Sequence, residues 1–154
     1  MSKEFIKFIF TYENKIRYAV FEKRFDGNAP NKTGGNGSGH SRISDPTAQK
    51  AITNAMPVNA VLIEYGESIN GRREMQRINY PEKWLRVIDE TYKFYDKKKQ
   101  GEVLYSKFKR NESRLETCRR MGIKKSWYSV LLNDCIKHAE RLAEGAGLLN
   151  KRGW

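Results

Sequence analysis

The residues best suited to a chemical task lie between Arg114 and Asn133, where basic side chains are interspersed with small polar ones. Lysine and arginine bind the phosphates of nucleic acids, whereas asparagine and valine can contact the edges of base pairs. We interpret this stretch as a surface for double-stranded DNA, in which Asn133 pairs with adenine and Val130 touches a thymine methyl group. The candidate DNA-binding residues are Arg114, Arg119, Arg120, Lys124, Lys125, Ser126, Ser129, Val130 and Asn133.

Two helices must position these residues. Ser113 and Glu116 have the spacing of a capping box, which predicts a helix that begins at residue 114. Gly122 can adopt the positive φ of a tight turn, so this helix should end at about residue 121. Ser126 is a second candidate N-cap, and it predicts a long helix over residues 127–144. A short helix, a glycine turn and a long helix together predict a helix-turn-helix.

The inner faces of the two predicted helices carry apolar residues where the helices would touch. These residues are Cys118, Met121, Ile123, Tyr128 and Leu131, with Thr117 at a position where an apolar residue is usual. Helical hairpins with short turns also occur in ordinary helical bundles. The pattern therefore favours a helix-turn-helix and leaves a plain bundle with a basic face as the alternative.

The charge of the chain points in the same direction. The 154 residues include 30 Lys+Arg and 18 Asp+Glu, which gives a formal net charge of +12. Between Lys97 and Lys125, eleven basic residues stand against three acidic ones. Such a cluster predicts a polyanionic partner, and the alternative is a solvated face that only prevents aggregation. With 38% hydrophobic residues, the chain is not a disordered basic tail.

The N-terminal segment, residues 1–26, is rich in aromatic and β-branched residues. Apolar residues at spacing two on both sides of Glu13 predict two strands, from about Ile6 to Tyr12 and from about Ile16 to Val20. The second window also places Ile16, Val20 and Phe21 on one face of a helix, so the spacing leaves a helix open.

Residues 27–43 contain glycine, asparagine and serine with almost no residue to bury, which predicts a flexible linker. Asp45 and Pro46 predict the start of a short helix that ends near residue 54. Asn70-Gly71 is a tight-turn pair, and it predicts a β-hairpin within residues 58–78. The predicted regions are the N-terminal segment 1–26, the linker 27–43, the helix and hairpin 44–79, and the helix-turn-helix domain 80–150.

Two further helices should precede the helix-turn-helix. Trp84, Leu85, Ile88 and Tyr92 have helical spacing, and they predict a helix that begins at Pro81, with residues 97–99 in its last turn and glycine 101 after it. A shorter helix should bury Val103, Leu104 and Phe108, and Asn111 should end it.

Residues that could support catalysis or bind a metal form no recognisable pattern. His40, Ser41, Ser44 and Asp45 lie within six residues of one another, whereas the members of a catalytic triad come from separate elements. Cys135 and His138 could hold zinc only with two ligands from elsewhere, and Cys118 and Cys135 both fit core positions. The glycines of the linker are not followed by the Lys-Ser/Thr of a nucleotide-binding loop. We expect no enzyme, no cofactor and no metal.

The order of these segments resembles a known family. The linker, "GHSRISDPTAQKAI", "PEKWLRVIDETY" and "ETCRRMGIKKSWYSVLLNDCIKHAERLAEGAGLL", over residues 34–149, look like phage-encoded late transcription regulators of the RinA/ArpU type. Their C-terminal helices are similar to the promoter-reading fourth region of sigma factors. The resemblance implies binding of double-stranded DNA near a phage promoter, through residues that match Lys124, Lys125, Ser126, Ser129 and Asn133. The aromatic-rich start and Trp127 depart from the family's pattern.

Together these observations predict a mainly α (α+β) protein, with some β-structure in the N-terminal region and a C-terminal helix-turn-helix. The expected function is sequence-specific DNA binding by a phage transcription regulator in the cytoplasm of a bacterial host. Expected partners are double-stranded DNA, a second copy of the chain, and host RNA polymerase or another host complex, without membrane attachment. The alternatives are a small terminase-like DNA-packaging subunit and an inhibitor that binds a host protein or nucleoprotein complex.

Overall fold

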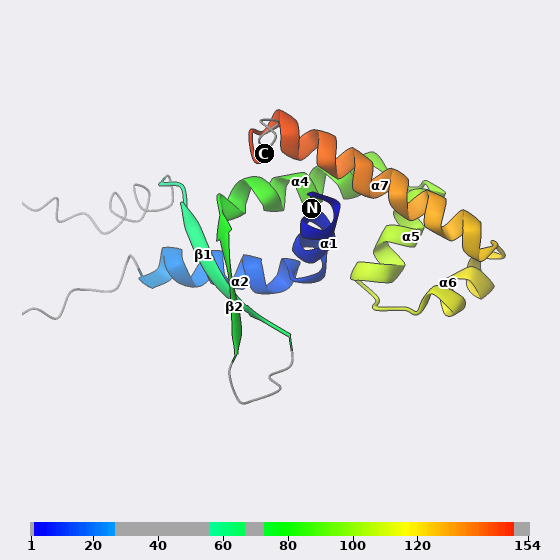
Figure 1. The fold of residues 1–154 in the computed structure, drawn as a ribbon, viewed down its shortest axis with the longest axis horizontal. Coiled ribbons are helices and arrows are strands. Elements are labelled where there is room, and N and C mark those ends of the chain that lie inside the picture. Colours follow the sequence, from blue (N-terminus) through cyan, green and yellow to red (C-terminus); the bar gives the residue numbers. More distant parts are fainter. Residues whose placement is uncertain (1, 27–55, 67–72, 150–154) are drawn as a thin grey trace, which may run out of the picture. The chain divides into compact units, whose positions relative to one another are not determined.

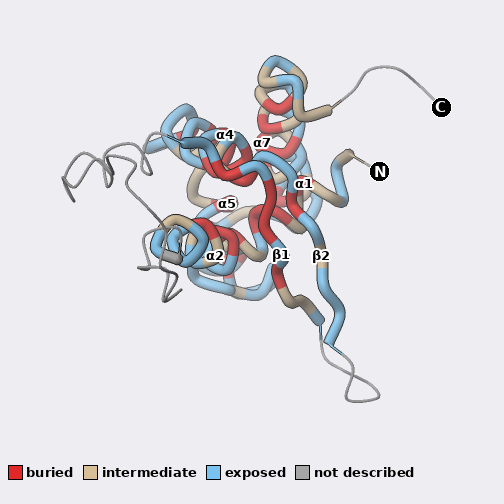
Figure 2. The backbone as a smooth tube through the Cα atoms, turned by 90° about the vertical axis from the view of Figure 1, so that its left-hand side faces the viewer, coloured by how far each residue is buried: buried red, intermediate tan, exposed pale blue. Residues whose placement is uncertain are grey.

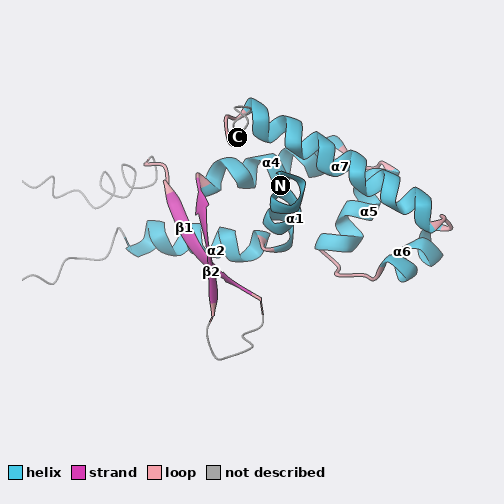
Figure 3. Cartoon of the chain, in the orientation of Figure 1, coloured by secondary structure: helices cyan, strands magenta, loops and turns pink. Residues whose placement is uncertain are grey.

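The computed structural model describes residues 2–26, 56–66 and 73–149 (Figure 1). These residues form six helices and two strands, so the protein is mainly α with a small β component, as predicted (Figure 3). The predicted linker, the predicted short helix and the predicted turn at Asn70-Gly71 lie outside the described residues. In chain order the elements are α1 (Ser2–Thr11), α2 (Glu13–Asp26), β1 (Ala60–Tyr65), β2 (Glu74–Asn79), α4 (Pro81–Phe94), α5 (Lys99–Phe108), α6 (Arg114–Met121) and α7 (Lys125–Gly145).

The chain divides into two compact units. The first unit combines the residues up to Glu13 with those from Lys83 onward, so it holds α1, most of α4, and the three last helices. The second unit, Asn14–Glu82, holds most of α2 and the two strands. This grouping differs from the predicted regions, because α1 belongs with the C-terminal helices.

In the first unit, α1 packs against α7 through one apolar face. Ile6, Ile9 and Phe10 follow the helical spacing of three and one residues, and each is buried to 1% exposure. At the edge of this face, the ring of Phe5 meets Trp84 of α4 edge-on, with 5.3 Å between ring centroids. The N-terminal helix is thus part of the core that the C-terminal helices form.

The prediction of two strands on either side of Glu13 is wrong, because this segment forms α1 and α2. Alternating apolar residues fit a strand, yet the residues that are buried follow the helical period: Ile16 and Val20 are one turn apart in α2, and both are buried. Phe21, which the helical alternative placed beside them, is instead 65% exposed.

In the second unit, β1 and β2 pair in antiparallel register within the segment where a hairpin was predicted. Val61 pairs with Ile78, and both are buried, whereas their neighbour Leu62 is exposed on the opposite face of the strand. The Nζ atom of Lys23 in α2 donates to the carbonyl of Ala60 at 2.5 Å. Three of the six residues of β1 are buried, whereas four of the six residues of β2 are exposed, and Figure 2 shows this difference between the strands.

The connection between α4 and α5 differs from the prediction. α4 ends at Phe94, Lys97 adopts a left-handed φ of 61°, and Gly101 lies inside α5 instead of after α4. A Cβ atom on Gly101 would lie 2.1 Å from the carbonyl oxygen of Tyr95. Glycine is therefore needed here because two backbone segments approach closely. The prediction that glycine 101 follows the end of α4 is wrong for this reason.

Candidate nucleic-acid interface

Helices α5, α6 and α7 pack around a small apolar core. Val103 of α5, Cys118 of α6, and Tyr128 and Leu131 of α7 are 6% exposed or less. Met121, Ile123 and Leu132 pack against this cluster. The predicted inner-face residues are therefore confirmed, and α5 completes a three-helix core.

A capping box begins α6, as predicted. The Ser113 hydroxyl oxygen accepts a hydrogen bond from the N–H of Glu116 at 3.2 Å, and the Glu116 carboxylate accepts one from the N–H of Ser113 at 2.9 Å. Thr117 is fully buried, and its hydroxyl lies 3.1 Å from both the Glu112 carboxylate and the Ser113 carbonyl. A polar residue fits this usually apolar position because its hydroxyl has hydrogen-bond partners.

Gly122 makes the turn between α6 and α7. Its φ of 65° and ψ of 35° are left-handed, and the N–H groups of Gly122 and Ile123 both donate to the carbonyl of Cys118. The space beside Gly122 is open, so the need for glycine is conformational and not steric. The predicted glycine turn is confirmed.

The start of α7 is open, in contrast to the capped start of α6. The prediction that Ser126 is the N-cap is wrong: Lys124 holds that position with extended φ and ψ, and it makes no side-chain cap. The first turn of α7 contains no acidic residue. The free N–H groups of this turn, together with the positive end of the helix dipole, favour an anion.

Cationic side chains lie at the open start of α7. Arg119, Lys124 and Lys125 are exposed, and together with Leu115 and Ser126 they line a shallow hollow at the turn between α6 and α7. Three of the predicted basic residues are thus brought together on one surface.

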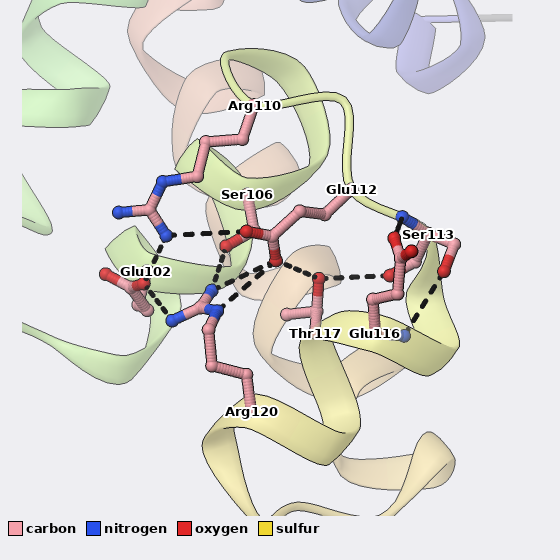
Figure 4. A network of polar contacts seen from close by, with 8 residues as sticks. All are labelled: Glu102, Ser106, Arg110, Glu112, Ser113, Glu116, Thr117 and Arg120. Atoms are coloured by element: carbon pink, nitrogen blue, oxygen red, sulfur yellow. Dashed lines mark hydrogen bonds and ion pairs between the residues drawn. The ribbon is translucent and has the colours of Figure 1, made fainter.

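Arg120, also predicted for this surface, instead joins α6 to α5 and to the loop between them (Figure 4). Its Nη1 lies 2.6 Å from Oε1 of Glu102, its Nη2 lies 3.2 Å from Oε2 of Glu112, and Nη2 also donates to Ser106 at 2.5 Å. Arg110 pairs with the same Glu102 oxygen at 3.1 Å. We call Arg120, Glu102, Glu112 and Arg110 the α5–α6 clasp.

The clasp changes the ionisation of its members. Hydrogen bonding and charge from Arg120 hold the pKa of Glu102 below its ordinary value. Burial alone would raise the pKa of Glu112, but the hydrogen bonds from Arg120 and Thr117, together with the positive charges of Arg120 and Arg110, lower it. The carboxylates in turn raise the pKa of Arg120.

Arg114 links α6 to α7. Its Nη2 donates to the carbonyl of Lys125 at 2.9 Å, and its guanidinium lies 5.9 Å from the centroid of the Tyr128 ring. Ser129 is half-buried, and its hydroxyl donates to the same carbonyl of Lys125 at 3.3 Å. Both predicted site residues therefore make contacts within the helix pair.

An exposed line of side chains runs along α7. Ser126, Val130 and Asn133, all predicted, are exposed at spacings of four and three residues. Lys137 and Arg141 continue the line at spacings of four and are also exposed. The sequence interpretation omitted these two residues, although their helical spacing from Asn133 was a usable signal.

Two titratable side chains of α7, Cys135 and His138, pack against neighbouring groups. Burial raises the pKa of the Cys135 thiol to about 12, and the thiol donates to the carbonyl of Gln100 at 3.3 Å. His138 stacks on Phe94 with 4.1 Å between centroids, and burial lowers its pKa. In the part of the chain that the structure describes, no three His, Cys, Asp or Glu side chains gather around a common point. His40, Ser41, Ser44 and Asp45 lie outside that part.

None of the helices in the described ranges is both long and apolar enough to cross a bilayer. The chain matches no protein-family model, no curated protein and no solved structure. The resemblance to RinA/ArpU-type regulators therefore remains a prediction from the sequence.

Proposed function

We propose that this protein binds double-stranded DNA through α6 and α7 and regulates transcription. The observation that carries the proposal is the open start of α7, which lacks a side-chain cap and is surrounded by Arg119, Lys124 and Lys125. Free N–H groups, a positive helix end and three cations form an anion-binding surface on an exposed corner. DNA phosphate is the anion that a helix-turn-helix of this kind meets.

In the proposed complex, α7 enters the major groove by its N-terminal end. Arg119, Lys124 and Lys125 contact phosphates and set the register, while Ser126, Val130 and Asn133 of the exposed line read base pairs. Arg120 is assigned no DNA contact, because its guanidinium is engaged by Glu102 and Glu112.

The regulatory role rests on the resemblance to phage late regulators. A second copy of the chain and host RNA polymerase belong to the same proposal. A regulator must prefer particular sequences, so sequence preference is the property to measure first.

The test is binding to a random-sequence duplex library at two salt concentrations, followed by sequencing of the retained DNA. We expect retention that falls steeply with salt and a pool enriched in one motif. The double variant K124E/K125E should lose retention at both salt concentrations. The single variants K124E and K125E should each weaken retention, and Lys3→Glu is the control matched to them in charge, because Lys3 is exposed on α1 and lies outside the helix-turn-helix. Absence of retention by the wild type at low salt would contradict the proposal.

A second candidate function, inhibition of a host protein or nucleoprotein complex, is favoured by the outer face of α2. Tyr18, Phe21 and Phe25 are more than 60% exposed there, and the rings of Phe21 and Phe25 stack at 6.2 Å. Large exposed aromatic side chains are typical of protein interfaces. Affinity for a host complex without affinity for free DNA would favour this candidate. Retention without sequence enrichment, by a ring-forming oligomer, would favour DNA packaging.

A further inference from the structure

The side chains that α7 offers to base pairs have an unusual chemistry. Ser126, Val130 and Asn133 form the exposed line over the first turns of the helix. Trp127 beside them is 47% exposed and Val130 is 45% exposed. The first three turns of this surface therefore present one amide, one hydroxyl and two apolar side chains, without a cation on the line itself.

The nearby arginines do not supply the missing cation. Arg114 donates to the carbonyl of Lys125, and Arg120 is held by the α5–α6 clasp. Arg119 lines the hollow at the turn with Lys124 and Lys125. Lys125 projects about 140° away from Val130 around the helix axis, whereas Trp127 projects only about 60° away from it.

The next cation on the line is too far along the helix to reach bases. Lys137 lies eleven residues beyond Ser126, which is about 16 Å along the axis at 1.5 Å per residue. The major groove is about 8.5 Å deep, so a helix that enters it by the N-terminal end keeps Lys137 near the phosphates. Guanine is read by arginine or lysine through O6 and N7, and this line has neither within reach.

The available side chains instead match A·T pairs. The asparagine amide can pair with N6 and N7 of adenine, and the thymine C5-methyl group is the apolar group of the major groove. Val130 and Trp127 expose apolar surface at the same end of α7 where the cations gather. An apolar surface beside a cationic one complements a methyl-lined groove between phosphates.

We infer that the preferred site is rich in A·T pairs beneath the first three turns of α7. Val130 and Trp127 contact thymine methyl groups, and Asn133 contacts adenine. This inference rests on the proposed function, since it names the kind of duplex that the same surface recognises.

The experiment uses the full chain and the duplex enriched from the random library, with single bases replaced. Uracil in place of thymine removes only the methyl group, and 7-deazaadenine in place of adenine removes only N7. We expect each uracil under α7 to weaken wild-type binding about fourfold, the value of one buried methyl group. Removal of the contacted N7 should weaken binding about tenfold. Uracil outside the enriched motif is the control and should leave the Kd unchanged.

Variants assign each effect to a residue. Val130→Ala and Trp127→Ala should each lose sensitivity to one uracil substitution, and Asn133→Ala should lose sensitivity to 7-deazaadenine. All three side chains are exposed, so the variants should keep the wild-type melting temperature, which circular dichroism checks.

The outcomes separate the two proposals. An enriched motif with G·C pairs under α7, retention without enrichment, or an A·T motif insensitive to uracil would each overturn the inference while DNA binding stood. An absence of retention on any duplex would overturn the proposed function itself.

Discussion

At the scale of single residues, Arg120 shows that a count of basic residues does not locate a binding surface. The run from Lys97 to Lys125 includes Lys109, Arg110 and Arg120, and each of these pairs with a carboxylate of the first unit. Lys109 lies 2.7 Å from Glu13, which is only 4% exposed. Part of the local charge excess therefore stabilises the fold, and only the cations without such a carboxylate remain as candidates for phosphate contacts.

We expect the α5–α6 clasp to make the protein less stable at acid pH. The pKa values of Glu102 and Glu112 are lowered in the folded state, so the clasp contributes fully above the ordinary value of 4.5. This contribution is lost as the pH falls through the lowered pKa values of Glu102 and Glu112, because protonation removes the negative charges that pair with Arg120. We expect the melting temperature of Glu102→Gln to fall less than that of the wild type between pH 6 and pH 3.

Thermal melts followed by circular dichroism at several pH values measure this difference. Glu90→Gln is a suitable control, because Glu90 is exposed on α4 and outside the clasp. Parallel curves for the wild type and Glu102→Gln would mean that the clasp adds no pH-dependent stability.

At the scale of elements, local signals predicted α6 and its turn well. The capping box at Ser113 and the left-handed Gly122 depend on residues within four positions, so sequence alone determines them. Where a tertiary contact decides, the sequence interpretation failed. The apolar spacing in residues 2–11 fitted a strand as well as a helix, and the burial of Ile9 in the folded protein shows the helix. Gly101 is required by the close approach of the Tyr95 carbonyl, which no local pattern shows. The engagement of Arg120 by two carboxylates equally required the packing of α5 on α6.

Two glycines in the first unit should respond differently to alanine. Gly122→Ala places a Cβ in open space, and it should cost about 1–2 kcal/mol of unfolding free energy through left-handed strain alone. Gly101→Ala places a Cβ against the backbone of Tyr95, so the turn after α4 must move away from α5, at a cost of about 3 kcal/mol or more.

Urea unfolding of both variants measures the two costs. Gly122→Asn is the informative control, since asparagine tolerates left-handed φ and should recover part of the loss. An equal loss for the alanine variants at both positions would show that close contact at Gly101 is not the cause.

At the scale of the whole molecule, α1 and α7 pack together within the first unit although they are far apart in the sequence. The hydroxyl of Ser2 donates to Glu140 on α7, and α1 supplies three buried side chains to the core. No local pattern could predict this contact, because its partners are 138 residues apart.

The contribution of α1 to stability can be measured with one substitution. Ile9→Ala removes a side chain that is 1% exposed, and it should lower the unfolding free energy by about 2–5 kcal/mol through lost burial and a residual cavity. Lys3→Ala, exposed on the same helix, should change it by less than about 0.5 kcal/mol. Urea titration compares the two variants, and equal midpoints would exclude α1 from the cooperative unit.

The salt dependence of DNA binding tests how far the contact surface extends along α7. Each cation that displaces a counterion adds about 0.9 to the slope of log K against log salt. Lys137→Ala and Arg141→Ala should therefore each reduce the slope by about that amount and leave the enriched motif unchanged, because phosphate contacts carry no base information. Asn133→Ala should do the reverse, with an unchanged slope and a relaxed motif. If neither Lys137→Ala nor Arg141→Ala changed the slope, the DNA-contacting surface would end at Asn133, and only the first turns of α7 would contact DNA.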